Sequence, residues 1–511
     1  MKKIIILFSI TTLYLNAAEL PINPVPAIEA PVHNPRSLFE IAKEKVCGRE
    51  YEKLQTLVQD DNVEKVDLLL TTNIKKTLDA DTFVNFLSCA QSNDMINVFF
   101  YRTNYSVNTT NTFQETPLHL ASQLGQMETV KLLINNNASI NEKTNLGQTP
   151  LHLASALGRM EIVKLLIDNN APINEKTNLG NTSLHIVLNK NQTEIAKFLI
   201  EKNASINEKN QYGQTPLHIA SSSDGNIEVV KLLIDNNASI NEKDQYGNTP
   251  LHFALGFKQI EIVKLLIEKN ASINEKNQYG QTPLHIASSS DGNIEVVKLL
   301  IKKNASLNEK TIFGQTPLHF ALGLEQIELA KLLIDNNASI NEKDQYGNTP
   351  LHFALEREQT EIVKLLIEKN ASINEKNQHG QTPLRIALEK KQTEIAKFLI
   401  NNNTSSSSLD EKDQHGQTLL HIALGLEQTE IAKLLIEKNA SLNEKDPHGQ
   451  TPLYIALARE QIEIAKLLIE KNASINEKNQ YGDTPLRVAL NKNQIEIVKL
   501  LIEKNASLNE N

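Results

Sequence analysis

The apolar and polar positions of this chain repeat about every 33 residues over most of its length. An opening threonine is followed by a short apolar segment, a polar turn, a longer apolar segment and a polar loop. A fixed period of this size is typical of stacked supersecondary units. Successive opening threonines lie 33 or 34 residues apart, with one gap of 36, at Thr116, Thr149, Thr182, Thr215, Thr249, Thr282, Thr316, Thr349, Thr382, Thr418, Thr451 and Thr484.

The unit around Thr249 shows which elements the pattern predicts. Thr249 is a good N-cap and Pro250 suits the first helical position, so we expect a short helix over about residues 251–257. Residues 262–267 form the apolar stripe of a second helix. Asn270 follows at the end of this helix, where a residue with left-handed backbone conformation is expected. One such pair cannot bury its apolar face alone, so stacking is required and we expect an all-α repeat solenoid.

The Gly-x-Thr-Pro-Leu-His opening, the Glu-Ile-Val-Lys-Leu-Leu second helix and the 33-residue period resemble the ankyrin repeat. The resemblance covers about residues 105–511. It implies stacked helix-turn-helix units with β-hairpin-like loops, and a curved array whose hairpin tips and first helices line a concave protein-binding face. It also implies no enzymatic activity.

The first residues predict an export signal. Lys2 and Lys3 precede an apolar run from Ile4 to Leu15, which is followed by Ala17 and Ala18. The run is too short to cross a bilayer as a helix, so we expect cleavage after residue 17 or 18, no membrane span afterwards, and a periplasmic or secreted protein. An uncleaved anchor is the alternative.

The remaining chain divides by composition into five further segments. Residues 19–36 read as a Pro-rich spacer and residues 37–110 as degenerate capping repeats. Ankyrin units fill 111–403 and 411–511, separated by a Ser-rich insertion at 404–410. Because this joint also has Leu419 where other units have proline, we expect a hinge there, and the first proteolytic cut.

Two cysteines, Cys47 and Cys89, are the only ones in the sequence. In an oxidising compartment they could form a disulfide, but their spacing does not establish that the Cα atoms lie within bridging distance. A disulfide and two buried thiols are both open.

Charge and motifs exclude several classes of function. The chain has 52 Lys and Arg against 61 Asp and Glu, whereas nucleic-acid binding needs a surplus of cations. The recurring Glu-Lys pairs indicate a solvated surface of mixed sign. The sequence has no phosphate-binding loop, nucleophile elbow or paired cysteines at metal-ligand spacing. We expect no enzyme, no cofactor and no nucleic-acid partner.

The repeated histidine of the Thr-Pro-Leu-His openings is not expected to bind metal. Each copy lies one unit from the next, roughly 8–10 Å away, which is too far for shared coordination of one ion. Resemblance to the family implies a hydrogen bond to the backbone of the adjoining hairpin instead. The histidines are His119, His152, His185, His218, His252, His285, His319, His352 and His421, and three units carry Arg385, Tyr454 and Arg487 in their place.

An Asn-Ala-Ser sequence recurs after the second helix, as at Asn137, Asn203, Asn237 and Asn270. It matches the acceptor of N-linked glycosylation, and Asp235 or Glu268 two positions earlier resembles a bacterial acceptor context. Selection of asparagine for its backbone conformation is the simpler interpretation.

One residue before each turn glycine, a position that the family resemblance places at a hairpin tip, large side chains recur. We call these the tip residues. They offer contact area to a partner, although packing of neighbouring tips on one another would explain them equally well. The series begins Phe113, Leu146 and Leu179, and our candidate partner-binding residues are Tyr212, Tyr246, Tyr279, Phe313, Tyr346, His379, His415, His448 and Tyr481.

We therefore expect a monomeric, exported scaffold that binds partner proteins of unknown identity and is directed at a host cell. The first alternative is a periplasmic partner or protector of a resident enzyme. The second is a catalytic domain within residues 36–115, which would place a site near Cys47 or Cys89.

Overall fold

The structure is a computed structural model of the chain and describes residues 56–58, 60–70, 79–88, 90, 92–222, 227–289, 294–402, 409–413 and 415–506. These residues form two compact units, one that ends at Gln278 and one that begins at Tyr279. Within the described ranges the secondary structure is helical and the connecting loops contain no strand. The predicted all-α repeat solenoid is thereby confirmed.

The first unit begins with three helices and continues as helix pairs. They are α4 (Val63–Leu69), α5 (Ala80–Leu87), α6 (Asn93–Arg102), α7 (Pro117–Leu124), α8 (Met127–Asn135), α9 (Pro150–Ala156), α10 (Met160–Asp168), α11 (Ser183–Asn189), α12 (Thr193–Glu201), α13 (Pro216–Ser222), α14 (Ile227–Asp235), α15 (Pro250–Gly256) and α16 (Ile260–Glu268).

The second unit consists of helix pairs of the same kind. They are α17 (Pro283–Ser289), α18 (Ile294–Lys302), α19 (Pro317–Gly323), α20 (Ile327–Asp335), α21 (Pro350–Glu356), α22 (Thr360–Glu368), α23 (Pro383–Glu389), α24 (Thr393–Asn402), α25 (Leu419–Gly425), α26 (Thr429–Glu437), α27 (Pro452–Ala458), α28 (Ile462–Glu470), α29 (Pro485–Asn491) and α30 (Ile495–Glu503).

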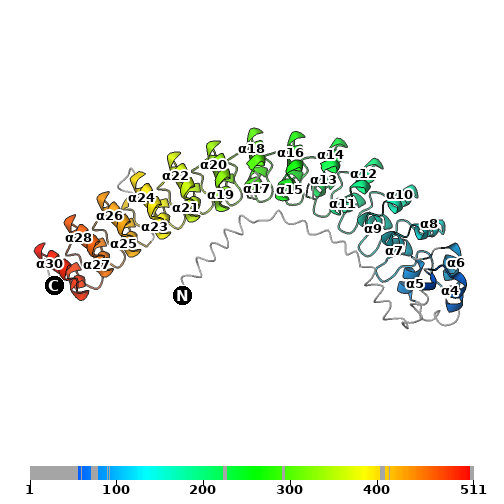
Figure 1. The fold of residues 1–511 in the computed structure, drawn as a ribbon, viewed down its shortest axis with the longest axis horizontal. Coiled ribbons are helices and arrows are strands. Elements are labelled where there is room, and N and C mark those ends of the chain that lie inside the picture. Colours follow the sequence, from blue (N-terminus) through cyan, green and yellow to red (C-terminus); the bar gives the residue numbers. More distant parts are fainter. Residues whose placement is uncertain are drawn as a thin grey trace. The chain divides into compact units, whose positions relative to one another are not determined.

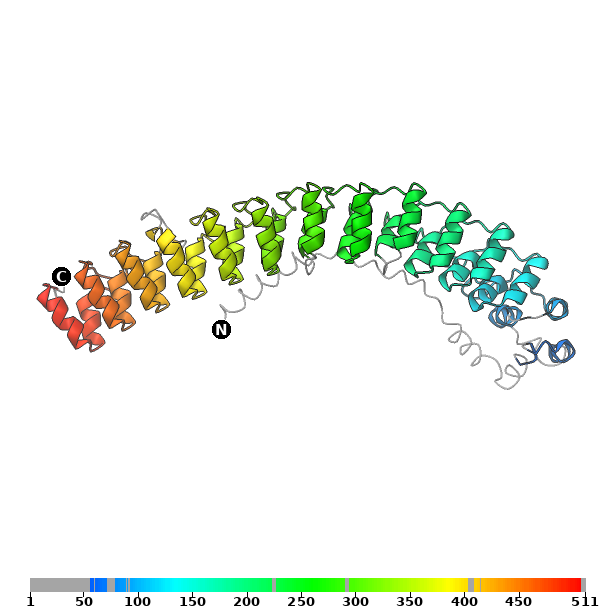
Figure 2. The same cartoon turned by 45° about the horizontal axis from the view of Figure 1, so that its top comes forward.

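In each unit the helices lie in two rows. The first helix of a pair packs on the first helix of the next pair, as α17 does on α19, and the second helices do the same, as α18 does on α20. Figure 1 shows the two rows by their labels, and Figure 2 shows from another direction that the pairs follow one another in chain order. Each pair therefore completes the core of its neighbours, as the sequence pattern requires.

The start of each first helix is fixed locally. Thr249 has extended backbone (φ −93°, ψ 167°) and forms a capping box with His252, and Pro250 is the first helical residue. The stripe of α16 is buried at Ile262, Val263, Leu265, Leu266 and Ile267. These observations confirm the predicted cap and the predicted buried face.

The end of each second helix is fixed by the recurrent asparagine. Asn270 has φ +62°, and the next residue, Ala271, is buried and donates from its N–H to Leu266 O at 2.9 Å. Asparagine tolerates the left-handed region better than most residues with a Cβ atom, which explains its use where glycine would be expected.

The opening histidine joins each repeat to the next. The Nδ1 atom of His218 accepts a hydrogen bond from the Thr215 N–H (3.1 Å), and its Nε2 atom lies 3.1 Å from the Asn248 carbonyl of the following hairpin. A carbonyl can only accept, so the ring is the neutral tautomer with its proton on Nε2. The hydrogen bond to the adjoining hairpin, implied by the family resemblance, is present.

Of the three repeats without this histidine, only the one with Arg385 has a described side-chain link of another kind to the next hairpin. Arg385 forms an ion pair with the buried carboxylate of Asp413 in the next hairpin. Tyr454 is half-buried, and its N–H donates to the Thr451 hydroxyl of its own repeat at 3.4 Å. Arg487 pairs within its own unit with Asp483, at 3.1 Å.

The helices that precede the regular repeats pack on the first of them, as α5 does on α7. Within residues 37–110, predicted to be degenerate capping repeats, α4 and α6 pack on each other. Asp67 and Arg102 form a bidentate ion pair between them (2.6 and 2.8 Å). Phe83 packs edge-on against Phe99 at 6.1 Å, so these helices have their own small aromatic core.

Several predictions lie outside the described residues. These are the signal at residues 1–18, the spacer at 19–36, Cys47, Cys89 and most of the insertion. Where the chain is described again it is in register: Leu409 is buried, and Asp410 Oδ1 accepts a hydrogen bond from Ser441 N at 2.6 Å. The equivalent bond in another unit joins Asn443 to Ser474. The hinge remains a prediction.

We predict that limited digestion with subtilisin cuts first within residues 403–408, and that the two fragments then stay together in gel filtration. Gln428 Nε2 donates to Leu388 O at 2.6 Å across this joint, and Lys397 pairs with Glu430. Separation of the fragments under native conditions would contradict the described packing, and an uncut loop would contradict the hinge.

We predict that Asn439→Ala lowers the free energy of unfolding by about 1 kcal/mol, because alanine is strained at φ +63°. Asn439→Gly should change it by less than about 0.5 kcal/mol. Urea midpoints followed by circular dichroism test this. Lys438→Ala is the control, since Lys438 has φ −85° and is exposed; equal effects of the two alanine substitutions would refute the explanation.

We predict that stability falls as the pH is lowered from about 6.5 to 4. Burial lowers the pKa of His152 to about 4, so the folded ring is neutral, whereas the unfolded ring has a pKa near 6.5 and takes up a proton in this window. The stabilisation is complete above pH 6.5, and about 3 kcal/mol per buried ring is lost on approaching pH 4. The same pKa of about 4 applies to His119, His185, His218, His319 and His352.

Thermal unfolding of the chain and of His152→Gln at successive pH values measures the effect. Glutamine at the third helical position keeps a capping box but does not titrate, so the variant should lose less stability between pH 6.5 and 4. Burial raises the pKa of Asp244 and Asp344, which act in the opposite direction. A melting temperature that is constant over this window would contradict the histidine assignment.

Candidate protein-binding surface

Each hairpin ends in a turn that is held by one polar side chain. The Asp244 N–H donates to Asn248 O (3.0 Å) and the Gly247 N–H to Asp244 O (3.0 Å). The Asp244 carboxylate accepts from the N–H groups of Tyr246 (2.9 Å) and Asn248 (2.8 Å). Asparagine and threonine replace the aspartate in other units and also accept from the tip residue, as Asn210 does from Tyr212.

The turn glycine is required by geometry. Gly247 has φ +77°, and a Cβ atom on it would lie 3.1 Å from the Cα atom of Asn277 in the next hairpin. Consecutive hairpins therefore approach closely at the glycine, and the preceding tip residue supplies the side chain.

Consecutive tips are joined by a backbone hydrogen bond. The Gln245 N–H donates to Tyr212 O at 2.9 Å, which links one tip to the next. The bond fixes the spacing of the tip residues within each unit. It recurs at Asn145–Phe113, Asn178–Leu146, Gln211–Leu179, Gln278–Tyr246, Ile312–Tyr279, Gln345–Phe313, Gln378–Tyr346 and Gln480–His448.

The candidate tip residues differ in exposure. Tyr212, Tyr246, Tyr279, Phe313 and Tyr346 are half-buried, whereas His379, His415, His448 and Tyr481 are exposed, Tyr481 at 74%. The sequence left two interpretations of the aromatic tips, packing on neighbouring tips and contact with a partner. Their half-burial is compatible with both, because part of each side chain is covered and part remains accessible.

The first helices contribute little to this surface. From Pro117 to Gln123 every side chain of α7 is buried, and α15 is buried from Pro250 to Leu255. The first-helix part of the expected binding face is therefore small, because these helices are enclosed by their neighbours. The accessible side chains come from the hairpins.

Ion pairs run beside the tips from one hairpin to the next. Lys209 Nζ lies 2.6 Å from Glu242 and also donates to Lys243 O at 3.2 Å. The Glu-Lys motif indicated a solvated surface of mixed sign, and this pairing was not predicted from it; the recurrence of the motif about once per repeat is the signal that could have indicated the pairs. The other pairs are Lys143–Glu175, Lys176–Glu208, Lys243–Glu275, Lys310–Glu342, Lys343–Glu375, Lys376–Glu411, Lys412–Glu444 and Lys445–Glu477.

This pairing neutralises the charges that flank the tips. Lys209 holds the pKa of the Glu242 carboxyl below its usual range, and Lys143 does the same to Glu175. The tip row is therefore an uncharged band of aromatic, imidazole and amide groups bordered by paired charges.

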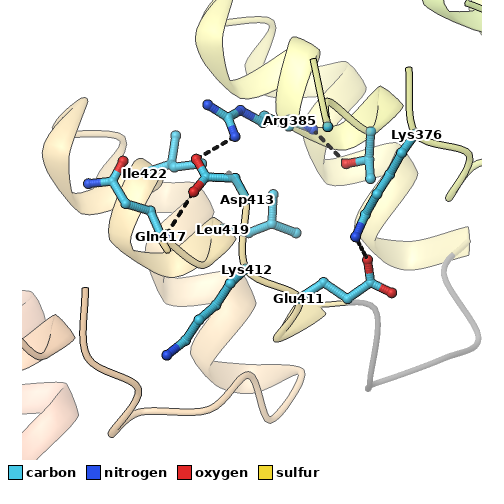
Figure 3. A pocket seen from close by; sticks show the side chains of 10 residues that line it. Lys376, Arg385, Glu411, Lys412, Asp413, Gln417, Leu419 and Ile422 are labelled. Carbon is cyan, nitrogen blue, oxygen red and sulfur yellow. Dashed lines mark hydrogen bonds and ion pairs between the residues drawn. The ribbon is translucent and has the colours of Figure 1, made fainter. Parts of the chain in front are cut away.

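A shallow pocket opens on the second unit between two consecutive hairpins, and Lys376, Arg385, Glu411 and Asp413 contribute to its lining. Figure 3 shows Arg385 pointing at Asp413 and Lys376 at Glu411 across it. Lys412, also in its lining, pairs with Glu444 at 2.9 Å. The charged side chains that line the pocket form ion pairs, so the pocket marks the contact between hairpins. Its lining residues are not arranged as an acid, a base and a nucleophile.

The opening histidines are not a metal site. Their ring nitrogens are engaged with the capping threonine and with the next hairpin. In the described ranges no group of three or more His, Cys, Asp or Glu side chains is arranged to hold a metal ion. Among these same residues, no helix combines the length and the apolar character needed to cross a membrane.

Comparison with known families agrees with this geometry. A model of three ankyrin repeats matches residues 54–177, 160–244, 238–311, 291–377, 371–446 and 440–511. A search of curated proteins gave no match. Ankyrin repeats are generally protein–protein interaction modules and are typically non-enzymatic. Because the matches run without interruption from residue 54 to residue 511, the chain belongs to the ankyrin-repeat family.

Proposed function

We propose that the mature protein is an exported scaffold that binds partner proteins, including proteins of a host cell, through the tip residues of its hairpins. Lys2 and Lys3, the short apolar run after them and the alanines at 17 and 18 support export. Ankyrin repeats bind protein partners in general, and the tip residues are half-buried or exposed, whereas the first helices are largely enclosed.

The observation that carries the proposal is the rigid, half-exposed aromatic row. Tyr279, Phe313 and Tyr346 occupy consecutive tips of the second unit, and the backbone bonds Ile312–Tyr279 (3.0 Å) and Gln345–Phe313 (2.8 Å) connect them. Large rings that are already held in place lose little conformational entropy on binding, which is typical of interface hot spots.

The uncharged character of the row favours recognition by contact area over recognition by charge. Lys310–Glu342 (2.8 Å) and Lys343–Glu375 (2.7 Å) neutralise each other beside it. Binding through the tips should therefore depend only weakly on salt.

The test is a paired capture experiment with residues 19–511 as bait. A second bait carries alanine at Tyr212, Tyr246, Tyr279, Phe313 and Tyr346. A third, matched control carries Gln at Glu201, Glu268, Glu368, Glu437 and Glu470, which are exposed at the ends of second helices. Circular dichroism establishes that all three are folded, and lysates of the producing cell and of a host cell are offered to each.

We expect a protein that is retained by the first and third baits, at 150 mM and at 500 mM salt, and is lost by at least tenfold on the alanine bait. Equal retention by all three baits would move the site away from the tips. Loss on the glutamine bait alone would assign binding to the second helices.

A further inference from the structure

The second helices end in a sequence that the fold does not explain completely. In eight repeats an acidic residue, any residue, and then Asn-Ala-Ser occur together, and seven of these segments lie entirely within the described residues. The asparagines are Asn203, Asn237, Asn270, Asn337, Asn370, Asn439 and Asn472, and the acidic residues two positions earlier are Glu201, Asp235, Glu268, Asp335, Glu368, Glu437 and Glu470. Asn505 follows Glu503 in the same way, but its serine lies outside the described residues.

The asparagine side chains are accessible on the folded protein. All seven are exposed, and so are the seven acidic residues. The backbone accounts for the turn itself: Asn270 N–H donates to Ile267 O (3.2 Å), and Ala271 is buried beneath it. The side-chain amide therefore projects from a fixed turn with room for a large substituent.

Backbone conformation explains the asparagine but not the acidic residue. An acidic side chain at the last position of a helix opposes the helix dipole, which favours a cation there. Lys302, in the same place on α18, shows that the fold accepts a cation.

Ion pairing does not explain most of the acidic residues either. Asp235 and Asp335 pair with Lys269 (3.0 Å) and Lys369 (3.7 Å), and both aspartates are more than half exposed. Within the described ranges Glu201, Glu268, Glu368, Glu437 and Glu470 have no ion pair.

The serine is not required by the fold. In the unit of α10 the sequence is Asp168-Asn169-Asn170-Ala171-Pro172, and Asn170 has the same left-handed backbone (φ +64°) without a hydroxyl two residues later. The turn conformation therefore does not explain why an acidic residue, an asparagine and a serine occur together.

We propose that these turns are acceptor sites for N-linked glycosylation, by an oligosaccharyltransferase that recognises the acidic residue together with the Asn-Ala-Ser sequence. Asn-x-Ser is the acceptor sequence of this modification in exported chains. The proposal rests on the export proposed above. It adds a row of glycans along the ends of the second helices, apart from the hairpin tips.

The reaction takes its glycan from a polyprenyl-diphosphate-linked oligosaccharide. The Asn Nδ2 atom bonds to the anomeric carbon, the bond from that carbon to the diphosphate oxygen breaks, and one amide proton passes to a base of the transferase. The serine N–H of the folded turn is engaged, as Ser272 is with Asn241 Oδ1 at 2.7 Å. The acceptor sequence can therefore adopt an extended conformation only before the repeats stack. We expect the chain to be modified while it is being exported.

The chain contains its own controls at the same structural position. Asn137 and Asn304 have the serine but lack the acidic residue, because Asn135 and Lys302 stand there. Asn170 has the acidic residue but lacks the serine. All three asparagines are exposed with φ between +61° and +65°, as are the proposed acceptors.

The test is the intact mass of the full chain purified from the envelope of the producing cell, since tryptic peptides such as Asn-Ala-Ser-Ile-Asn-Glu-Lys recur in several units. We expect a ladder of masses separated by one glycan. Glu268→Gln should remove one glycan, whereas Pro172→Ser and Lys302→Glu should each add one. Glu268 and Lys302 are exposed and Pro172 is half-buried, so we expect the three substitutions to leave the fold intact.

Three results would overturn the proposal. A chain that has lost its signal and carries no glycan would refute it while leaving export intact. Glycans whose number does not respond to the three variants would refute the role of the acidic residue and the serine. An unmodified chain that retains its signal would refute export and glycosylation together.

Discussion

Each opening histidine satisfies two requirements with one ring. Its Nδ1 atom accepts from the N-terminal cap of its own helix, and its Nε2 atom donates to the backbone of the next hairpin, as His319 does to Asn348 (3.3 Å). The ring is buried and neutral, so it can bond in both directions without the cost of burying a charge. Helix start and stacking register are thereby set by the same side chain, and the position of every hairpin follows from it.

The exposed contacts between consecutive hairpins follow the same register. Backbone bonds between tips, Lys–Glu pairs beside them and asparagine links such as Asn341 to Ser372 (2.8 Å) all join residues about one repeat apart. Each exposed contact is weak by itself, and an exposed ion pair contributes roughly 0–1 kcal/mol. Repeated along a stack that is already aligned, they make the hairpin edge stiffer than a row of independent loops. A rigid aromatic edge is a suitable surface for protein binding, and the proposed glycans at the ends of the second helices would be attached to other residues than the tips.

The elements within one unit could be predicted from the sequence because their causes are local. Thr249 and Pro250 specify a helix start, Asn270 specifies a left-handed end, and the spacing of apolar residues specifies a buried face. The contacts between repeats were harder to predict from the sequence, because they join residues about one repeat apart that meet only after stacking. The pairing of Arg385 with Asp413, where histidine is missing, is one example. The candidate partner-binding residues were selected only by their position before the turn glycine, and their role in binding stays a prediction. The half-burial of Tyr279 and the exposure of His448 follow from packing that the sequence does not state.

The central claim is that the protein binds its partner through the hairpin tips. Hydrogen–deuterium exchange of the full chain, with and without a captured partner, tests it most directly. The account predicts that added protection is concentrated at the tips, in segments such as 278–281 and 345–348, while the ends of the second helices, such as 368–370, exchange as before. Protection confined to the second helices, with the tips unchanged, would contradict it.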